Sequence, residues 1–156
     1  MRTKVAINGF GRIGRSFLRL IYSNLDYEVV AINDLANAEI LAHLFKYDSI
    51  HGVFDQEIRS ENNNLIVNGY KIPVFQIKDD ERFPWDDLEI DVVIEATGKR
   101  LTYDLSSIHL DSGAKKVIIT APPKSDSIKL IVMGVNEASW LGNALGCSRN
   151  RFGENN

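Results

Sequence analysis

The chain has 156 residues, of which 44% are hydrophobic and 25% are charged, a composition typical of a soluble globular protein with one domain and a core. Its net charge of -3 excludes the positive excess that general binding to nucleic acid or anionic membranes requires. The single cysteine, Cys147, excludes a disulfide within the chain, and no apolar run approaches the roughly 18 residues of a membrane span. Because the first residues are charged and lead into an apolar run too short for a secretion signal, we expect a cytoplasmic protein.

The first half of the chain alternates predicted strands and helices. Residues 5–7 are a short, apolar, β-prone run that ends at Asn8, and residues 27–34 form a second such run. Residues 12–22 and 37–48 have the apolar spacing of amphipathic helices, the second with Asn37 as a cap. The apolar residues of these helices are Ile13, Phe17, Leu18, Leu20 and Ile21 in the first, and Ile40, Leu41, Leu44 and Phe45 on one face of the second.

The second half begins with a change of pattern. Residues 53–75 alternate loosely and contain Asn68-Gly69, a strong hairpin signal, which predicts a small antiparallel excursion. A short helical turn follows at 83–88; the remaining predicted elements are strands at 91–98, 115–123 and 129–136 and a helix at 102–113 that ends at Gly113. This order favours an α/β fold with a Rossmann-type, doubly wound, mostly parallel sheet. Residues 138–156 have no clear period, and we expect much of this segment to be loosely ordered.

Three glycines separate the first predicted strand from the first helix, in the pattern Gly9-x-Gly11-x-x-Gly14. In this context the pattern is typical of dinucleotide binding. Gly9 permits a tight turn, Gly11 lets a pyrophosphate approach the backbone, and Gly14 lets the helix pack on the strand. The N–H groups around Arg12 and Ile13 then face the phosphates. The alternative is a glycine-rich turn that binds nothing.

Further residues stand at the ends of predicted strands. Asp34 follows Gly14 by 20 residues, where a carboxylate accepts both adenine-ribose hydroxyls and repels a 2′-phosphate, so NAD is favoured over NADP. Thr97-Gly98 and Thr120-Ala121-Pro122 follow later strands, at the edge where open α/β sheets bind ligands. The alternatives are a capping or turn aspartate at Asp34 and simple turn chemistry at the other two sites.

Six motifs now occur in order and at matching spacings: KVAINGFGRIGR, AIND, KYDSIHG, FPWDDLEIDVVIEATG, GAKKVIITAP and VMGVNE. Together they closely resemble the cofactor-binding half of phosphorylating glyceraldehyde-3-phosphate dehydrogenase, over residues 1–137. The resemblance implies an NAD-binding Rossmann domain at 1–137, a non-family tail at 138–156 and an absent catalytic domain, so we expect a truncated chain.

The resemblance also implies the residues that hold NAD. These are Asn8, Gly9, Phe10, Gly11, Arg12, Ile13, Gly14, Asn33, Asp34, Lys78, Thr97, Gly98 and Thr120. Lys78 stands where the family usually has an arginine near the adenine, and Thr120 where it usually has a serine near the nicotinamide ribose. Among the departures, Ile77 replaces a usual glutamate, and Leu35-Ala36 and Lys99-Arg100 replace usual adenine-pocket residues, although Arg100 could stack on adenine.

The family's chemistry uses a cysteine in a Ser-Asn-Ala-Ser-Cys-Thr-Thr-Asn stretch. Its thiolate attacks the aldehyde, hydride passes to NAD, and phosphate cleaves the thioester, while a histidine of the second domain acts as the base. Cys147 lies in a different context, ALGCSRNRF, and only 11 residues after Asn136, a shorter spacing than the family's, so we expect an incidental thiol. The histidines do not match the family's base and are expected to be structural; they are His43, His51 and His109. No catalytic and no metal-binding residue is therefore predicted.

The leading hypothesis is the cofactor-binding domain of an NAD-dependent glyceraldehyde-3-phosphate dehydrogenase of glycolysis, inactive by itself. The alternatives are a piece of erythrose-4-phosphate dehydrogenase and a stand-alone, non-catalytic nucleotide-binding module. The resemblance implies a homo-oligomer, a tetramer in the complete family, and a sugar-phosphate substrate only in the complete enzyme. No nucleic-acid or membrane partner is expected.

Overall fold

The computed structural model describes residues 1–78, 81–131 and 145–148, the last four by their backbone alone. The strands are β1 (Thr3–Asn8), β2 (Tyr27–Asn33), β3 (Tyr47–Asp48), β4 (Gly52–Val53), β5 (Ile58–Glu61), β6 (Asn64–Val67), β7 (Tyr70–Phe75), β8 (Val92–Glu95), β9 (Lys116–Ile119), β10 (Lys129–Ile131) and β11 (Leu145–Ser148). The helices are α1 (Arg12–Ile21), α2 (Ala38–Lys46), α3 (Tyr103–Ser106) and α4 (Ile108–Asp111). Within the described ranges, nine of these strands form one sheet in the order β10-β11-β9-β8-β1-β2-β7-β6-β5.

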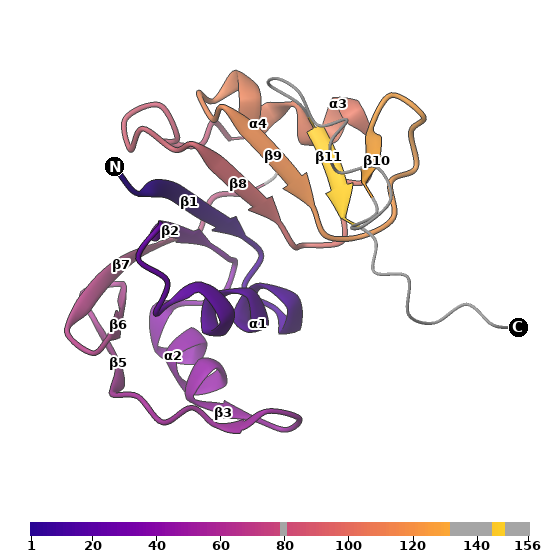
Figure 1. The fold of residues 1–156 in the computed structure, drawn as a ribbon. Helices are drawn as coiled ribbons and strands as arrows, with labels where there is room; N and C mark the ends of the chain where they lie inside the picture. Colours follow the sequence, from indigo (N-terminus) through magenta and orange to yellow (C-terminus); the bar gives the residue numbers. More distant parts are fainter. Residues whose placement is uncertain (79–80, 132–144, 149–156) are drawn as a thin grey trace, which may run out of the picture.

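The sheet is mostly parallel and is covered by helices on both faces. Strand β1 lies at its centre, with β2 on one side and β8 on the other, both parallel to it. Figure 1 shows α1 and α2 on one side of the sheet and α3 and α4 on the other. This confirms the predicted Rossmann-type, doubly wound architecture. The order in which strands are added to the sheet reverses at β1, because the chain continues to β2 on one side and later adds β8 on the other.

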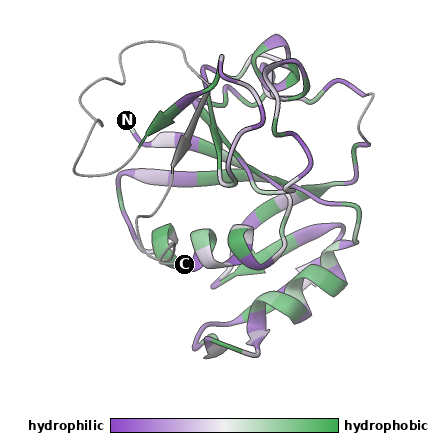
Figure 2. Ribbon diagram, turned by 90° about the vertical axis from the view of Figure 1, so that its right-hand side faces the viewer, coloured by the Kyte–Doolittle hydropathy of each residue, from purple (hydrophilic) through white to green (hydrophobic). Residues whose placement is uncertain are grey.

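Two hydrophobic clusters, one on each face, explain why the central strands have unbroken apolar stretches, such as residues 5–7 of β1 and 29–32 of β2. Along β1, Ile7 belongs to the cluster beneath α1 and α2, whereas its neighbour Ala6 belongs to the cluster of the opposite face. Ile32 and Ala31 divide in the same way along β2. Since alternate residues of a strand point to opposite faces, a strand buried on both sides needs apolar residues throughout. The central strands are correspondingly rich in hydrophobic residues in Figure 2.

The predicted antiparallel excursion is confirmed. Strands β5, β6 and β7 pair antiparallel, and β7 then joins β2 in parallel. Asn68 and Gly69 form the expected turn, both with positive φ (49° and 80°). A second turn at Asn62-Asn63, also with positive φ, was not predicted.

The KYDSIHG motif folds into a small ribbon that was not predicted either. Its two strands, β3 and β4, pair antiparallel. Asp48 ends β3 and accepts hydrogen bonds from the backbone N–H groups of Ile50 and His51, each at 2.9 Å. These bonds lower the pKa of Asp48 to about 2, so its carboxylate is ionised and closes the turn of the ribbon.

Both predicted long helices form, and Asn37 caps α2 by accepting the N–H of Ile40 at 3.0 Å. The predicted end of the second helix at residue 48 is wrong, because α2 ends at Lys46 and the next two residues form β3. Their buried faces are narrower than the apolar patterns indicate, because Leu20 of α1 is 78% exposed and Ile40 of α2 is 50% exposed. The residues that face the core are Gly14, Leu18 and Ile21 in α1, and Ala38, Leu41, Ala42 and Phe45 in α2. In α1 the close approach to the sheet needs a glycine, because a Cβ on Gly14 would lie 3.1 Å from the side chain of Ile7.

The predicted helix at 102–113 is divided into α3 and α4 by a turn residue, Ser107, and it ends as expected at Gly113, where φ is +103°. The longest described helix, α1, has 10 residues. No helix in the described part of the chain is therefore long and apolar enough to cross a bilayer.

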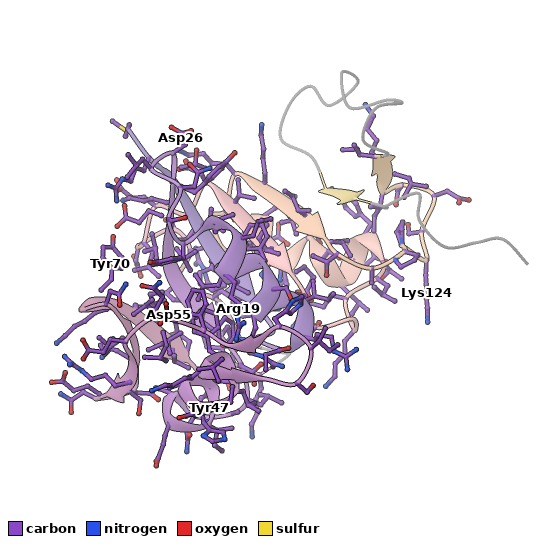
Figure 3. All side chains as sticks on the ribbon, turned by 60° about the horizontal axis from the view of Figure 1, so that its bottom comes forward. Arg19, Asp26, Tyr47, Asp55, Tyr70 and Lys124 are labelled. Atoms are coloured by element: carbon purple, nitrogen blue, oxygen red, sulfur yellow. The ribbon has the colours of Figure 1, made fainter. Side chains whose placement is uncertain are left out.

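Arg19 links α1 to the end of α2. Its guanidinium lies over the rings of Phe54 and Phe45, with centroid distances of 4.9 and 5.7 Å, and its Nη2 donates to the carbonyl of Phe45 at 2.6 Å. Figure 3 shows Arg19 in the part of the molecule that also carries Tyr47 and Asp55, away from Lys124. This arginine is therefore a packing residue as well as a charge.

The C-terminal segment, much of which was expected to be loosely ordered, contains an ordered strand at residues 145–148 that was not predicted. These residues form β11, which lies parallel between β9 and β10 and pairs with both. A strand of four residues is too short for a periodic pattern of apolar residues to reveal it. Only the pairing with β9 and β10 identifies these residues as a strand. The rest of the segment, and residues 132–136 of the predicted strand at 129–136, lie outside the described residues.

Candidate functional site

A cleft of about 410 Å³ opens at the carboxyl ends of the central strands β1, β2 and β8. It is lined by Asn8, Gly9, Gly11, Asn33, Asp34, Leu35, Ile77, Lys78, Phe83, Ala96, Thr97, Lys99 and Arg100. Seven of these residues belong to the set predicted from the sequence: Asn8, Gly9, Gly11, Asn33, Asp34, Lys78 and Thr97. The cleft lies at the switch point of the sheet, where ligands of open α/β folds bind.

Strand register brings the polar ends of three strands together. Asn8, the last residue of β1, pairs with Asn33 of β2 on one side and with Glu95 of β8 on the other. The backbone continues this alignment past the strands, because Gly9 N–H donates to Asn33 O at 2.8 Å and Ala96 N–H donates to Asn8 O at 2.7 Å. The floor of the cleft is therefore a fixed row of side chains rather than a flexible loop.

The three glycines of the pattern differ in what a side chain would meet at each position. Gly9 has a φ of +91°, and a Cβ there would lie 2.7 Å from the backbone nitrogen of Thr97. A Cβ on Gly14 would lie 2.2 Å from the carbonyl oxygen of Gly9, so this glycine lets α1 pack against the turn. At Gly11, by contrast, no atom lies within 4 Å of the added Cβ. Gly11 is thus unnecessary for packing, and its missing side chain leaves open space in the cleft.

The first turn of α1 presents its N–H groups at this open space. Gly11 is the N-cap, and the first helical hydrogen bond runs from Arg15 N–H to Gly11 O at 3.0 Å. The N–H groups of Arg12 and Ile13 precede that bond, and neither a capping side chain nor an acidic residue stands in the first turn. The positive end of the helix is therefore left for an anion, and both residues are exposed.

Asp34 ties the glycine turn to the next segment of the chain. Its Oδ2 accepts the N–H of Phe10 at 2.8 Å, and its Oδ1 accepts the N–H of Ala36 at 2.9 Å. The turn role considered as an alternative for Asp34 is therefore present in the structure. It does not exclude a ligand, because each carboxylate oxygen has a second lone pair and Asp34 is only partly buried.

A buried polar cluster lies directly beneath the cleft, and the sequence-based site did not include it. Glu95 is 1% exposed and accepts the side-chain amide of Asn8 at 2.6 Å. His109 is fully buried, with Nε2 at 3.0 Å from the same Glu95 oxygen and Nδ1 at 3.0 Å from the indole nitrogen of Trp85. The sequence signal for this cluster was only the position of Glu95 at a strand end.

The pKa values of the two titratable groups of the cluster are both lowered. Burial alone would raise the pKa of Glu95, but hydrogen bonds from His109, Thr97 and Asn8 outweigh burial and hold it below its ordinary value. Burial lowers the pKa of His109 and outweighs the attraction of Glu95. The cluster therefore contains an ionised carboxylate beside a neutral imidazole.

The structure places the other predicted site residues around the cleft rather than in its lining. Phe10 buries its ring in the core, and Gly14 lies beneath the turn. Thr120 follows β9 and donates its N–H and hydroxyl to the carbonyl of Glu95, at 3.0 and 3.1 Å. Gly98, with a φ of +70°, separates two lining residues.

Arg100, which the sequence analysis considered as a stacking partner for adenine, lines the cleft and is held by the protein. It is 5% exposed, lies over the ring of Phe83 at 5.8 Å from the centroid, and donates to the carbonyl of Leu105 at 2.9 Å. Its guanidinium is thus committed to the protein. Phe83 itself was not predicted to line the cleft, because nothing in its local pattern reveals that its segment is held at the end of α4, where the N–H of Phe83 donates to Ser112 Oγ at 3.3 Å.

Comparisons with known proteins agree with this geometry. The model of the family described as glyceraldehyde 3-phosphate dehydrogenase, NAD binding domain, matches residues 3–103. The chain is 52% identical over 142 residues to glyceraldehyde-3-phosphate dehydrogenase of Buchnera aphidicola subsp. Schizaphis graminum, covering 91% of this chain and 42% of that protein. It is 51% identical over 140 residues to the Geobacillus stearothermophilus protein of the same name, covering 90% and 42%. With that of Thermotoga maritima it shares 52% over 136 residues, 86% of this chain and 40% of the relative. The chain thus spans about two fifths of the length of these relatives.

Proposed function

Because the chain belongs to the glyceraldehyde-3-phosphate dehydrogenase family, whose NAD-binding domain matches residues 3–103, we propose that the cleft at the ends of β1, β2 and β8 is its NAD site. The observation that carries this proposal is the open space at Gly11, where no protein atom lies within 4 Å of a Cβ. A pyrophosphate would lie there beside the N–H groups of Arg12 and Ile13, two exposed residues in the first turn of α1.

The chain's own residues would hold and orient the two halves of the cofactor. Asp34 would accept the hydroxyls of the adenine ribose, and the exposed Lys78 lines the cleft on the same side. Thr97, Gly98 and Thr120 would border the nicotinamide half. When bound, NAD supplies a hydride acceptor; the role of these residues is to place it at the carboxyl edge of the sheet.

We further propose that this domain serves the phosphorylating oxidation of glyceraldehyde 3-phosphate in the cytoplasm, within a homo-oligomer. The family membership supports this proposal. A stand-alone nucleotide-binding module is the second candidate, and the cleft supports it equally, because its lining residues include only positions assigned to cofactor binding or to the protein's own packing. The two candidates share the NAD site and differ in whether a catalytic thiol acts beside it.

NADP is expected to bind at least about tenfold more weakly than NAD, because about 1.4 kcal/mol of repulsion between Asp34 and a 2′-phosphate suffices for that ratio. Calorimetric titration with each cofactor measures the ratio. In Asp34→Asn the gap should narrow, although affinity for NAD also falls because an amide can keep only one of the two backbone hydrogen bonds. Equal affinities of the parent for the two cofactors would remove Asp34 from its assigned role.

The 156-residue chain alone is expected not to oxidise glyceraldehyde 3-phosphate. The thiol that the family's chemistry needs has no counterpart in its motif, and Cys147 lies in β11 between β9 and β10. Formation of NADH from aldehyde, phosphate and NAD should not exceed the background, and Cys147→Ser should change nothing. Turnover that disappears in Cys147→Ser would contradict both expectations.

A further inference from the structure

Glu95 ends β8 directly beneath the cleft but does not line it. Its carboxylate is the meeting point of two chains of hydrogen bonds. Each chain of hydrogen bonds starts from an N–H group, which can only donate. This first donor determines the orientation of each side-chain amide and the tautomer of the imidazole that follow it.

The first chain starts at the backbone N–H of Ile77, which donates to Asn33 Oδ1 at 2.8 Å. This bond fixes the amide of Asn33, whose Nδ2 donates to Asn8 Oδ1 at 2.8 Å. The amide of Asn8 is thereby fixed too, and its Nδ2 donates to Glu95 Oε2 at 2.6 Å. Two side chains that line the cleft thus have a single permitted orientation, which depends on an acceptor at Glu95.

The second chain starts at the indole N–H of Trp85, which donates to His109 Nδ1 at 3.0 Å. Because this nitrogen accepts, the proton of the neutral imidazole lies on Nε2, which donates to Glu95 Oε2 at 3.0 Å. Trp85 therefore determines the tautomer of His109. Neither chain can reverse without leaving a buried donor against another donor.

The other oxygen of Glu95 holds the turn that follows β8. Glu95 Oε1 accepts the backbone N–H of Thr97 at 2.9 Å and also its hydroxyl. Each carboxylate oxygen thus receives two hydrogen bonds. The N–H groups of Thr97, Asn8 and His109 can only donate, and an ionised carboxylate accepts all of them together with the Thr97 hydroxyl, whereas an amide would place its NH₂ group against at least one of these donors.

We propose that Glu95 is the positioning residue of the NAD cleft, which holds the Thr97 turn on one side and the Asn8–Asn33 amide pair on the other in the shape that receives the cofactor. This inference rests on the proposed function of the cleft. Glu95 is 1% exposed, so it acts through Thr97 and Asn8 and does not touch the cofactor.

The test moves the buried negative charge from position 95 to position 8. In Glu95→Gln an NH₂ group replaces one oxygen. In one orientation it faces the backbone N–H of Thr97, and in the other it faces the donors of Asn8 and His109, so we expect affinity for NAD to fall about tenfold or more. In Asn8→Asp/Glu95→Gln the carboxylate moves to position 8, where it accepts from the introduced amide at position 95 and from Asn33. His109 can reach it as well, because Asn8 Nδ2 lies 3.4 Å from His109 Nε2. The double variant keeps the net charge of the parent and should recover most of the lost affinity.

Three measurements make the result decisive: calorimetric NAD titration, circular dichroism, and nitrogen NMR of the His109 tautomer. Glu89→Gln is the matched control, since Glu89 lies on the surface with Lys4, and it should bind NAD like the parent. The parent should show a proton on His109 Nε2, with or without cofactor.

If the parent does not bind NAD, the proposed function fails, whereas the NMR signal still tests the hydrogen-bond chains. The positioning role is overturned by a folded Glu95→Gln that binds like the parent, by a proton on His109 Nδ1, or by a double variant that folds but stays as weak as Glu95→Gln. Should Glu95→Gln unfold, a folded double variant that binds NAD supports the role, and an unfolded double variant overturns it.

Discussion

Gly11→Val is expected to abolish NAD binding while the chain stays folded. Gly11 has an ordinary negative φ of -69°, and no atom lies within 4 Å of a Cβ at this position. The fold therefore loses only the N-cap preference of glycine over valine, about 1 kcal/mol. In the cleft, by contrast, the valine methyl groups occupy the space that the pyrophosphate needs. Calorimetric titration with NAD, together with thermal unfolding followed by circular dichroism, measures both effects.

The matched control is Gly14→Ala, three residues further along, in the first turn of α1. A Cβ there meets the carbonyl oxygen of Gly9 at 2.2 Å and the side chain of Ile7 at 3.1 Å. We therefore expect a loss of about 3 kcal/mol of unfolding free energy from overpacking. The two variants separate the functional glycine from the packing glycine. A Gly11→Val protein that binds NAD like the parent would show that the cofactor does not approach this part of the turn.

Two of the three glycines are predictable from sequence because they answer a local backbone requirement. Gly9 needs a positive φ, and Gly14 needs the absence of a Cβ between a helix and the turn that precedes it. The order of strands and helices also determines which strand ends meet, so Asn8 and Asp34 could be assigned to one edge from the sequence. These features depend on residues close together in the chain or on the direction of parallel strands.

The features that sequence reasoning missed depend on contacts between distant segments. Glu95 and His109 are 14 residues apart, and Trp85 reaches His109 across 24 residues. Nothing in the local pattern distinguishes such a buried pair from a surface glutamate and an incidental histidine. Strand β11 was missed for the same reason, because its place between β9 and β10 is a property of the sheet and not of its four residues.

Phe45→Ala is expected to lower the unfolding free energy by about 4 kcal/mol, because removing a fully buried aromatic side chain leaves a cavity. The Phe45 ring is 0% exposed and lies 5.5 Å from the ring of Phe10 and 5.0 Å from that of Phe54, between centroids. For a domain of this size the melting temperature should fall by about 10 °C. Urea unfolding should show a lower midpoint with an unchanged slope.

Ile40→Ala is the control on the same helix, because the apolar pattern alone places Ile40 and Phe45 on one face. Ile40 is 50% exposed, so its truncation removes little buried surface, and alanine is the better helix former. We expect a change within about 0.5 kcal/mol. Equal losses in the two variants would show that α2 turns a different face to the sheet. That outcome would also affect the cofactor site, because Phe45 packs against Phe10, whose N–H is held by Asp34 at the edge of the cleft.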